Sequence, residues 1–234
     1  MNRRFAILSA LLRYPDDGLR ADLSDIADTV ATAGFAPVHA RALLRLARRL
    51  GAGDPLDRQE EYVKLFDRGR STSLHLFEHV HGDTRNRGPA MIELAQAYQA
   101  AGFAIDGNEL PDYLPLFLEF LAVAPSETAH AMLSQAAPII DQLHARLLAR
   151  AQPPARAYAA VAAAALAEAG ALPQAKSTAA DEQADEDELA ALDAAYEDAP
   201  VVFGPESDPD RSNVRASMSA MISRLKRLRA SGAL

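Results

Sequence analysis

The sequence predicts an all-α protein, in which a single antiparallel helical bundle is followed by a flexible, charge-segregated C-terminal tail. Apolar residues recur three and four positions apart through most of residues 1–172, which places them on one face of each helix. No stretch shows the sustained alternation of a half-buried strand. Short connections between helices favour antiparallel neighbours. We therefore expect a helical domain over residues 1–172 and a second region over residues 173–234.

Three helices are expected within residues 5–51. Gly34 and Gly51 follow the last periodic residues of the second and third helices, where glycine commonly ends a helix. Pro37 suits the first turn of the third helix. The residues expected on the apolar faces of these helices are Phe5, Leu8, Leu11, Leu12, Leu19, Leu23, Ile26, Val30, Leu43, Leu44, Leu46 and Leu50.

A fourth helix is expected to begin at Asp54 and Pro55, a good N-cap and first-turn pair, and to end near Gly69. Residues 70–83 are harder to assign. We expect a short helix or helical turn around residues 74–80.

The remaining helices are delimited by proline and glycine. One is expected through residues 91–98 and ends at Gly102. Pro115 would remove a hydrogen bond from the next helix unless that helix begins near Asp112. Two further helices are expected: one over residues 126–150, with a kink where it contains a proline, and one from the Pro-Pro pair at 153 to Gly170.

Composition excludes several classes of function. The chain has no cysteine, which excludes disulfides, thiolate catalysis and Cys-ligated metal clusters. No apolar run approaches the roughly 20 residues that span a bilayer. The apolar stretch at residues 5–12 is too short for a secretory signal, and no small-residue cleavage site follows it. Glycine-rich nucleotide motifs and the nucleophile elbow of serine hydrolases are also missing.

The tail separates its charges. Residues 181–210 contain twelve acids and no Lys or Arg, whereas residues 211–234 contain six bases and no acid. Residues 173–188 lack large apolar side chains, which predicts a disordered linker. The last residues form a basic amphipathic pattern that suits a membrane surface, nucleic acid or an acidic partner. The preceding acids would repel phosphate, so we expect the tail to dock weakly on the chain's own acidic run in preference to nucleic acid.

Histidines, acids and aromatics gather in residues 57–82. His75, Glu78 and His79 match H-x-x-E-H, in which two histidines on one helix face share Zn²⁺ and the glutamate activates water. This pattern leaves a zinc hydrolase open as an alternative function, with Glu119 as a nominal third ligand. The other interpretation is that the histidines form a polar cluster with nearby carboxylates.

Aromatic and acidic residues in the same region suggest a groove for a partner. Tyr62 and Phe66 fit either the core or the rim of such a groove. Asp112 and Glu119 are seven residues apart, which would place them on one face of a single helix. There they would meet a cationic partner.

The segments EEYVKLFDRGRSTSLHLFEHVHGDTRNRGPAMIELAQAYQAAGF and ELPDYLPLFLEFLA resemble the NarJ family, the assembly chaperones of respiratory nitrate reductase. LLRYPDD near the start and YEDAPVVFG near the end fit the same family. The resemblance implies an all-helical cytoplasmic protein that is not an enzyme. Its implied partner is the apo catalytic (alpha) subunit of nitrate reductase. The chaperone would bind the N-terminal segment of that subunit until a molybdenum cofactor and an iron–sulfur cluster are inserted.

The resemblance also implies which residues bind the partner peptide, and no catalytic residue, metal ligand or cofactor of the chaperone itself. We expect the apolar side of a client helix to lie on Tyr62, Phe66 and Leu114. Its basic residues are expected to meet four acids, Asp67, Glu78, Asp112 and Glu119. Protonation of His79 or His81 near pH 6 is expected to help release. We expect a monomer or weak dimer that binds no nucleic acid and inserts into no membrane; a helical membrane-surface adaptor is a further alternative. The predicted peptide-binding residues are Tyr62, Phe66, Asp67, Arg70, Glu78, His79, His81, Asp112, Tyr113, Leu114 and Glu119.

Overall fold

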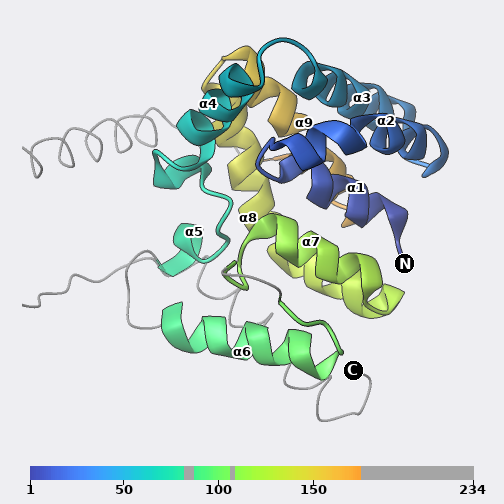
Figure 1. Ribbon diagram of the computed structural model, residues 1–234. Helices are drawn as coiled ribbons and strands as arrows, with labels where there is room; N and C mark the ends of the chain where they lie inside the picture. Colours follow the sequence, from blue (N-terminus) through green and yellow to red (C-terminus); the bar gives the residue numbers. More distant parts are fainter. Residues whose placement is uncertain (82–86, 106–108, 175–234) are drawn as a thin grey trace, which may run out of the picture.

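A computed structural model of the chain describes residues 1–81, 87–105 and 109–174. Within them, helices follow one another through a bundle, and no strand forms (Figure 1). The helices are α1 (Arg3–Leu12), α2 (Asp17–Thr32), α3 (Pro37–Gly51), α4 (Pro55–Phe66), a 3₁₀ turn η1 (Arg70–Thr72), α5 (Glu78–His81), α6 (Arg87–Ala100), α7 (Leu114–Val123), α8 (Ser126–Ala149) and α9 (Pro153–Glu168).

Local capping chemistry fixes many helix ends. The carboxylate of Asp16 accepts a hydrogen bond from the backbone N–H of Leu19 at 2.7 Å, and the carboxylate of Asp54 accepts one from that of Leu56 at 2.9 Å. Such side-chain acceptors satisfy backbone donors that the first turn of a helix leaves unpaired. Gly34 follows α2 with φ of 79°, the left-handed conformation that glycine adopts without strain.

The core lies where α8 and α9 pack along each other and where α1 packs along α7. α3 covers α9, and α2 covers α3. α6 lies on the far side of α7 from α1 (Figure 1) and is held there by aromatic contact, since the rings of Tyr98 and Phe120 are 4.6 Å apart. Phe5, Phe77 and Phe117 are fully buried in this core.

The predicted all-α bundle is confirmed for the described residues. Residues 74–80 do not form one helical turn: Arg70–Thr72 is a 3₁₀ turn, and α5 begins only at Glu78. α7 begins at Leu114, which leaves Pro115 in the first turn, where it removes no internal hydrogen bond.

Further expectations concern α8, membrane-spanning helices and the C-terminal tail. α8 runs from Ser126 to Ala149 as one helix, with Pro138 inside it. In the described part of the chain, no helix has the length and apolar character needed to cross a membrane. The acidic run and the basic amphipathic segment fall within residues 175–234, which lie outside the described ranges. Those expectations, and the boundary predicted at residue 172, stay predictions.

Candidate functional site

Two segments that are far apart in the sequence pair through their backbones. The N–H of Leu76 donates to the carbonyl of Asp112 at 3.0 Å, and the N–H of Leu114 donates to the carbonyl of Leu74 at 2.8 Å. His75 and Tyr113 lie opposite each other in this antiparallel contact. We call it the 75–113 bridge. It joins the histidine-rich segment to the segment that leads into α7.

Asp112 is the buried centre of this bridge, with 0% of its surface exposed. Its Oδ2 accepts a hydrogen bond from the N–H of Phe77 at 3.0 Å, and its Oδ1 lies 3.2 Å from Nδ1 of His75. The guanidinium of Arg87 is 4.0 Å away. A buried carboxylate needs such donors because it has left water.

The same carboxylate changes the proton affinity of His75. Burial of the imidazole lowers its pKa, but the hydrogen bond and negative charge of Asp112, with a contribution from Glu78, outweigh burial and raise the pKa above its ordinary value. The side chain is half-buried at the surface, with 28% exposed. His75 is therefore a partly accessible histidine whose protonated form is favoured.

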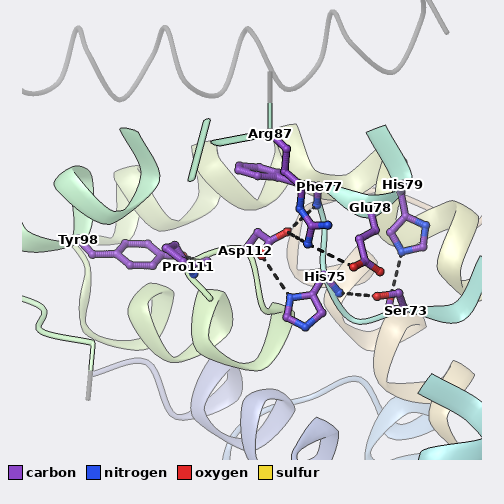
Figure 2. Close-up of polar contacts among 9 residues, drawn as sticks. All are labelled: Ser73, His75, Phe77, Glu78, His79, Arg87, Tyr98, Pro111 and Asp112. Carbon is purple, nitrogen blue, oxygen red and sulfur yellow. Dashed lines mark hydrogen bonds and ion pairs between the residues drawn. The ribbon is translucent and has the colours of Figure 1, made fainter. Parts of the chain in front are cut away.

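Contacts from α6 hold the outer side of the bridge. Arg87, the first residue of α6, donates from Nη2 to Oε1 of Glu78 at 3.2 Å. At the other end of α6, the hydroxyl of Tyr98 donates to the carbonyl of Pro111 at 2.9 Å (Figure 2). These contacts hold both segments of the 75–113 bridge against α6.

His79 anchors the segment to α8 from the inner side. Its Nε2 lies 2.8 Å from the carbonyl of Ser73, and its Nδ1 lies 3.0 Å from Nη1 of Arg146. A carbonyl only accepts and a guanidinium only donates, so Nε2 carries the proton and Nδ1 is bare. Burial of the imidazole, assisted by the positive charge of Arg146, lowers the pKa of His79 to about 4. His79 is therefore a neutral structural link.

An aromatic cluster supports the bridge from α4. The hydroxyl of Tyr62 donates to the carbonyl of Leu12 at 2.8 Å and lies 3.0 Å from the hydroxyl of Tyr113. The ring of Tyr62 packs 4.8 Å from that of Phe66 and 5.5 Å from that of Tyr14. Burial raises the pKa of the Tyr62 hydroxyl well above its ordinary range, so it acts as a fixed hydrogen-bonding group.

Four side chains bring this arrangement to the surface, and we call them the Tyr113 patch: Tyr14, Asp67, His75 and Tyr113. Tyr14 is 41% exposed, Asp67 is exposed, and the other two are half-buried. The rings of His75 and Tyr113 are 5.4 Å apart. Partial burial raises the pKa of Asp67, and the nearby His75 acts in the opposite direction. The patch combines two phenol rings with one accessible acid, which suits an amphipathic cationic helix.

The structure separates the predicted peptide-binding residues by accessibility. Tyr62, Phe66 and Leu114 are 4%, 4% and 1% exposed, so the expectation that they offer an apolar surface to a client is wrong for this conformation. These three side chains belong to the buried core that supports the Tyr113 patch. Arg70 is exposed, and His81 ends α5, although its side chain lies outside the described part.

The four predicted acids also differ. Asp112 is buried, Glu78 is paired with Arg87, and Asp67 and Glu119 are exposed. The expected shared helix face of Asp112 and Glu119 is wrong, because α7 begins two residues after Asp112. Direct contact of Asp67 and Glu119 with a partner stays a prediction.

The structure also does not arrange His75 and His79 as a zinc site would need. His75 precedes α5 and faces Asp112, while His79 lies in α5 with both ring nitrogens engaged. The two histidines therefore do not share a helix face. Among the described residues, no three His, Cys, Asp or Glu side chains are placed to hold a metal ion. The expected protonation of His79 near pH 6 is wrong as well, because its pKa is about 4.

Sequence reasoning missed two partners of the site. Arg146 lies 67 positions after His79, and no spacing rule links them. Tyr14 belongs to LLRYPDD, which the sequence links only to the family resemblance, and α2 and α3 lie between it and its partner Tyr62 in the sequence. A buried histidine with one bare ring nitrogen requires a hydrogen-bond donor, but nothing in the sequence identifies Arg146 as that donor.

Comparisons with known proteins show the family to which the chain belongs. A family model described as nitrate reductase delta subunit matches residues 32–160, more than half of the chain. This chain belongs to the nitrate reductase delta subunit family. Because the match includes both segments of the 75–113 bridge, the bridge lies within the part of the chain that defines membership. The predicted resemblance to NarJ proteins is confirmed by the relatives that follow.

Relatives within this family include proteins from two organisms. The chain is 46% identical over 145 residues to the nitrate reductase molybdenum cofactor assembly chaperone NarJ of Escherichia coli (strain K12), which covers 62% of this chain and 61% of that protein. The probable chaperone of the same kind named NarW, also from E. coli K12, is 40% identical over 147 residues, or 63% and 61% of the two chains. The probable NarJ of Bacillus subtilis (strain 168) is 34% identical over 143 residues, or 61% and 77%. The match thus spans about three-fifths of the E. coli relatives.

Proposed function

We propose that this protein is an assembly chaperone of respiratory nitrate reductase. It binds the apo catalytic subunit through that subunit's N-terminal segment and keeps it competent for insertion of the molybdenum cofactor and an iron–sulfur cluster before membrane docking. It acts in the cytoplasm as a binding protein and transforms no substrate. The names of the E. coli and B. subtilis relatives support this function.

The observation that carries the proposal is the Tyr113 patch. Buried anchors at Asp112 and His79 hold its side chains in place, so a partner meets a preorganised surface. Tyr14 and Tyr113 offer apolar ring surface, and Asp67 offers a negative charge to a basic residue of the client helix. Charge pairs of this kind set orientation and association rate more than affinity.

Calorimetric titration of the full chain with a peptide from the N-terminus of the nitrate reductase catalytic subunit tests this function. Asp67→Lys reverses the accessible charge in the patch, and we expect the dissociation constant to rise about tenfold, the equivalent of about 1.4 kcal/mol. Asp28→Lys makes the same change at an exposed position of α2 and should leave binding unchanged. Failure of the wild-type protein to bind the peptide would refute the proposal, and equal losses in both variants would remove the Tyr113 patch from it.

The pH dependence of peptide binding tests the role of His75. Protonation of His75 places a positive charge beside Asp67 and weakens attraction for a cationic client. Other charges that face His75 are Asp112, Glu78 and Arg87. We expect affinity to fall from pH 7.5 to pH 6 in the wild type and to change less in His75→Gln. The same pH profile in both proteins would show that His75 is not responsible.

A further inference from the structure

A cavity lies between α3, α4 and α9, where Arg58 lines it from the first turns of α4. The Tyr113 patch lies near the other end of α4, because Asp67 follows the last residue of that helix. Its volume is about 650 Å³. Five arginines line it, together with alanines and one proline, and no acidic side chain of the described residues lines it. We call it the arginine pocket. Its arginines are Arg45, Arg48, Arg49, Arg58 and Arg156.

A single carboxylate balances part of this charge. Arg49 donates to Oε1 of Glu61 at 2.8 Å, and Arg58 lies 3.0 Å from Oε2 of the same residue. Within the described ranges, Arg45, Arg48 and Arg156 form no ion pair, and all three are exposed. The pocket therefore carries a substantial excess of positive charge.

Ordinary helix chemistry accounts for only some of these arginines. Arg48 and Arg49 lie in the last turn of α3, where a cation complements the negative end of the helix dipole. Arg156 and Arg58 have the opposite placement, because each is the fourth residue of its helix, close to the positive end of the dipole. In addition, Nε of Arg58 is buried without a hydrogen-bond partner among the described residues.

Five guanidinium groups thus converge on one cavity beside the positive end of the α9 dipole, and both features favour an anion. Guanidinium groups match phosphate oxygens in a bidentate geometry. The cavity volume is in the range of small-molecule sites, and its alanine walls offer apolar surface beside the charges.

We propose that the arginine pocket binds the diphosphate group of a small organic ligand. Two linked phosphates present charge and acceptor oxygens to arginines from both sides of the cavity, Arg45 on α3 and Arg156 on α9, which a single phosphate reaches less completely. The proposal does not depend on the client-binding function, because it concerns a different end of α4.

Calorimetry on the full chain at fixed ionic strength, with inorganic pyrophosphate as the probe and inorganic phosphate as the comparison, tests the pocket. We expect saturable pyrophosphate binding that is at least tenfold tighter than phosphate binding. Arg45→Gln combined with Arg156→Gln should weaken pyrophosphate binding at least tenfold, because it removes one guanidinium from each side of the cavity. Both positions are exposed, so the fold tolerates a neutral polar side chain there. Arg41→Gln, at an exposed position of α3 outside the pocket, should leave it unchanged.

The acidic run at residues 181–210 is another source of anions for the same pocket. A full-length variant with Asp185, Glu186, Asp187 and Glu188 changed to their amides separates the two sources. Pyrophosphate binding that is equal or tighter in this variant supports the diphosphate site, the increase measuring competition by the acidic run. Absence of pyrophosphate binding from both proteins, or binding that Arg45→Gln and Arg156→Gln leave intact, would overturn the proposal.

Discussion

Replacement of His79 by glutamine should remove much of the acid sensitivity of this fold. The native state holds the imidazole neutral, because Nε2 donates to Ser73 and Nδ1 accepts from Arg146. Protonation of Nδ1 would lose the second hydrogen bond and set two cations against each other in a buried site. Glutamine retains a donor and an acceptor but cannot take up the proton.

The magnitude follows from the pKa of His79, which is lowered from 6.5 to about 4 in the folded protein. A histidine with a depressed folded pKa is protonated more readily in the unfolded chain, so acid favours unfolding. The loss begins as pH falls through about 6.5 and is complete below about 4. Between pH 7 and pH 5, linkage gives a loss of about 2 kcal/mol from this residue.

Urea unfolding of the wild type and His79→Gln at pH 7 and pH 5 measures this contribution. The free energy of unfolding should fall between the two pH values by about 2 kcal/mol less in the variant than in the wild type, whatever the variant's stability at pH 7. Other titrating groups, including His75 with its opposite shift, cancel in this comparison. His130→Gln, at an exposed position of α8, is the matched control for the loss of an imidazole. An unchanged pH dependence in His79→Gln would refute the assignment of a buried neutral imidazole.

Three further substitutions test parts of the fold, each by equilibrium unfolding at pH 7. Asp112→Ala removes the buried acceptor of the Phe77 N–H and should destabilise the fold by about 2–3 kcal/mol, and a loss below about 0.5 kcal/mol would contradict its role in the 75–113 bridge. Tyr113→Phe removes the hydrogen bond to Tyr62 and should cost about 0.5–1 kcal/mol, because Tyr113 is only half-buried; no change would show that water replaces the bond. Ala151→Gly should stabilise by about 0.5 kcal/mol, since Ala151 has φ of 53°, and destabilisation would contradict the left-handed assignment.

The helices could be predicted because their ends depend on neighbours in the sequence. Asp54 caps the helix that follows it, and Gly34 supplies the left-handed residue after α2. Apolar spacing likewise identified the buried faces, as with Phe5 and Leu43, which are 0% exposed. In each case, the interaction that decides the structure spans a few residues.

The sequence draws attention to residues 57–82, but the contacts that shape the candidate site could not be predicted from it. Residues 70–81 take their shape from partners outside the segment: Asp112 is 37 positions from His75, and Arg146 is 67 positions from His79. No periodicity records such pairs. As a result, Asp112 was expected at the surface beside a client, although its charge is used inside the protein.

The burial of these anchors bears on how substitutions in the site are to be interpreted. The segment has little regular structure of its own, only a 3₁₀ turn and the four residues of α5, so buried polar contacts replace helix hydrogen bonds in fixing it. Thr72 donates to the carbonyl of Leu65, and Asp112 accepts from Phe77. Removal of one partner leaves a buried polar group unsatisfied, so such networks are lost together rather than by degrees. A substitution at Asp112 should therefore weaken client binding and stability together, whereas one at the exposed Asp67 should weaken binding alone, and only the second kind of loss identifies a residue that touches the client.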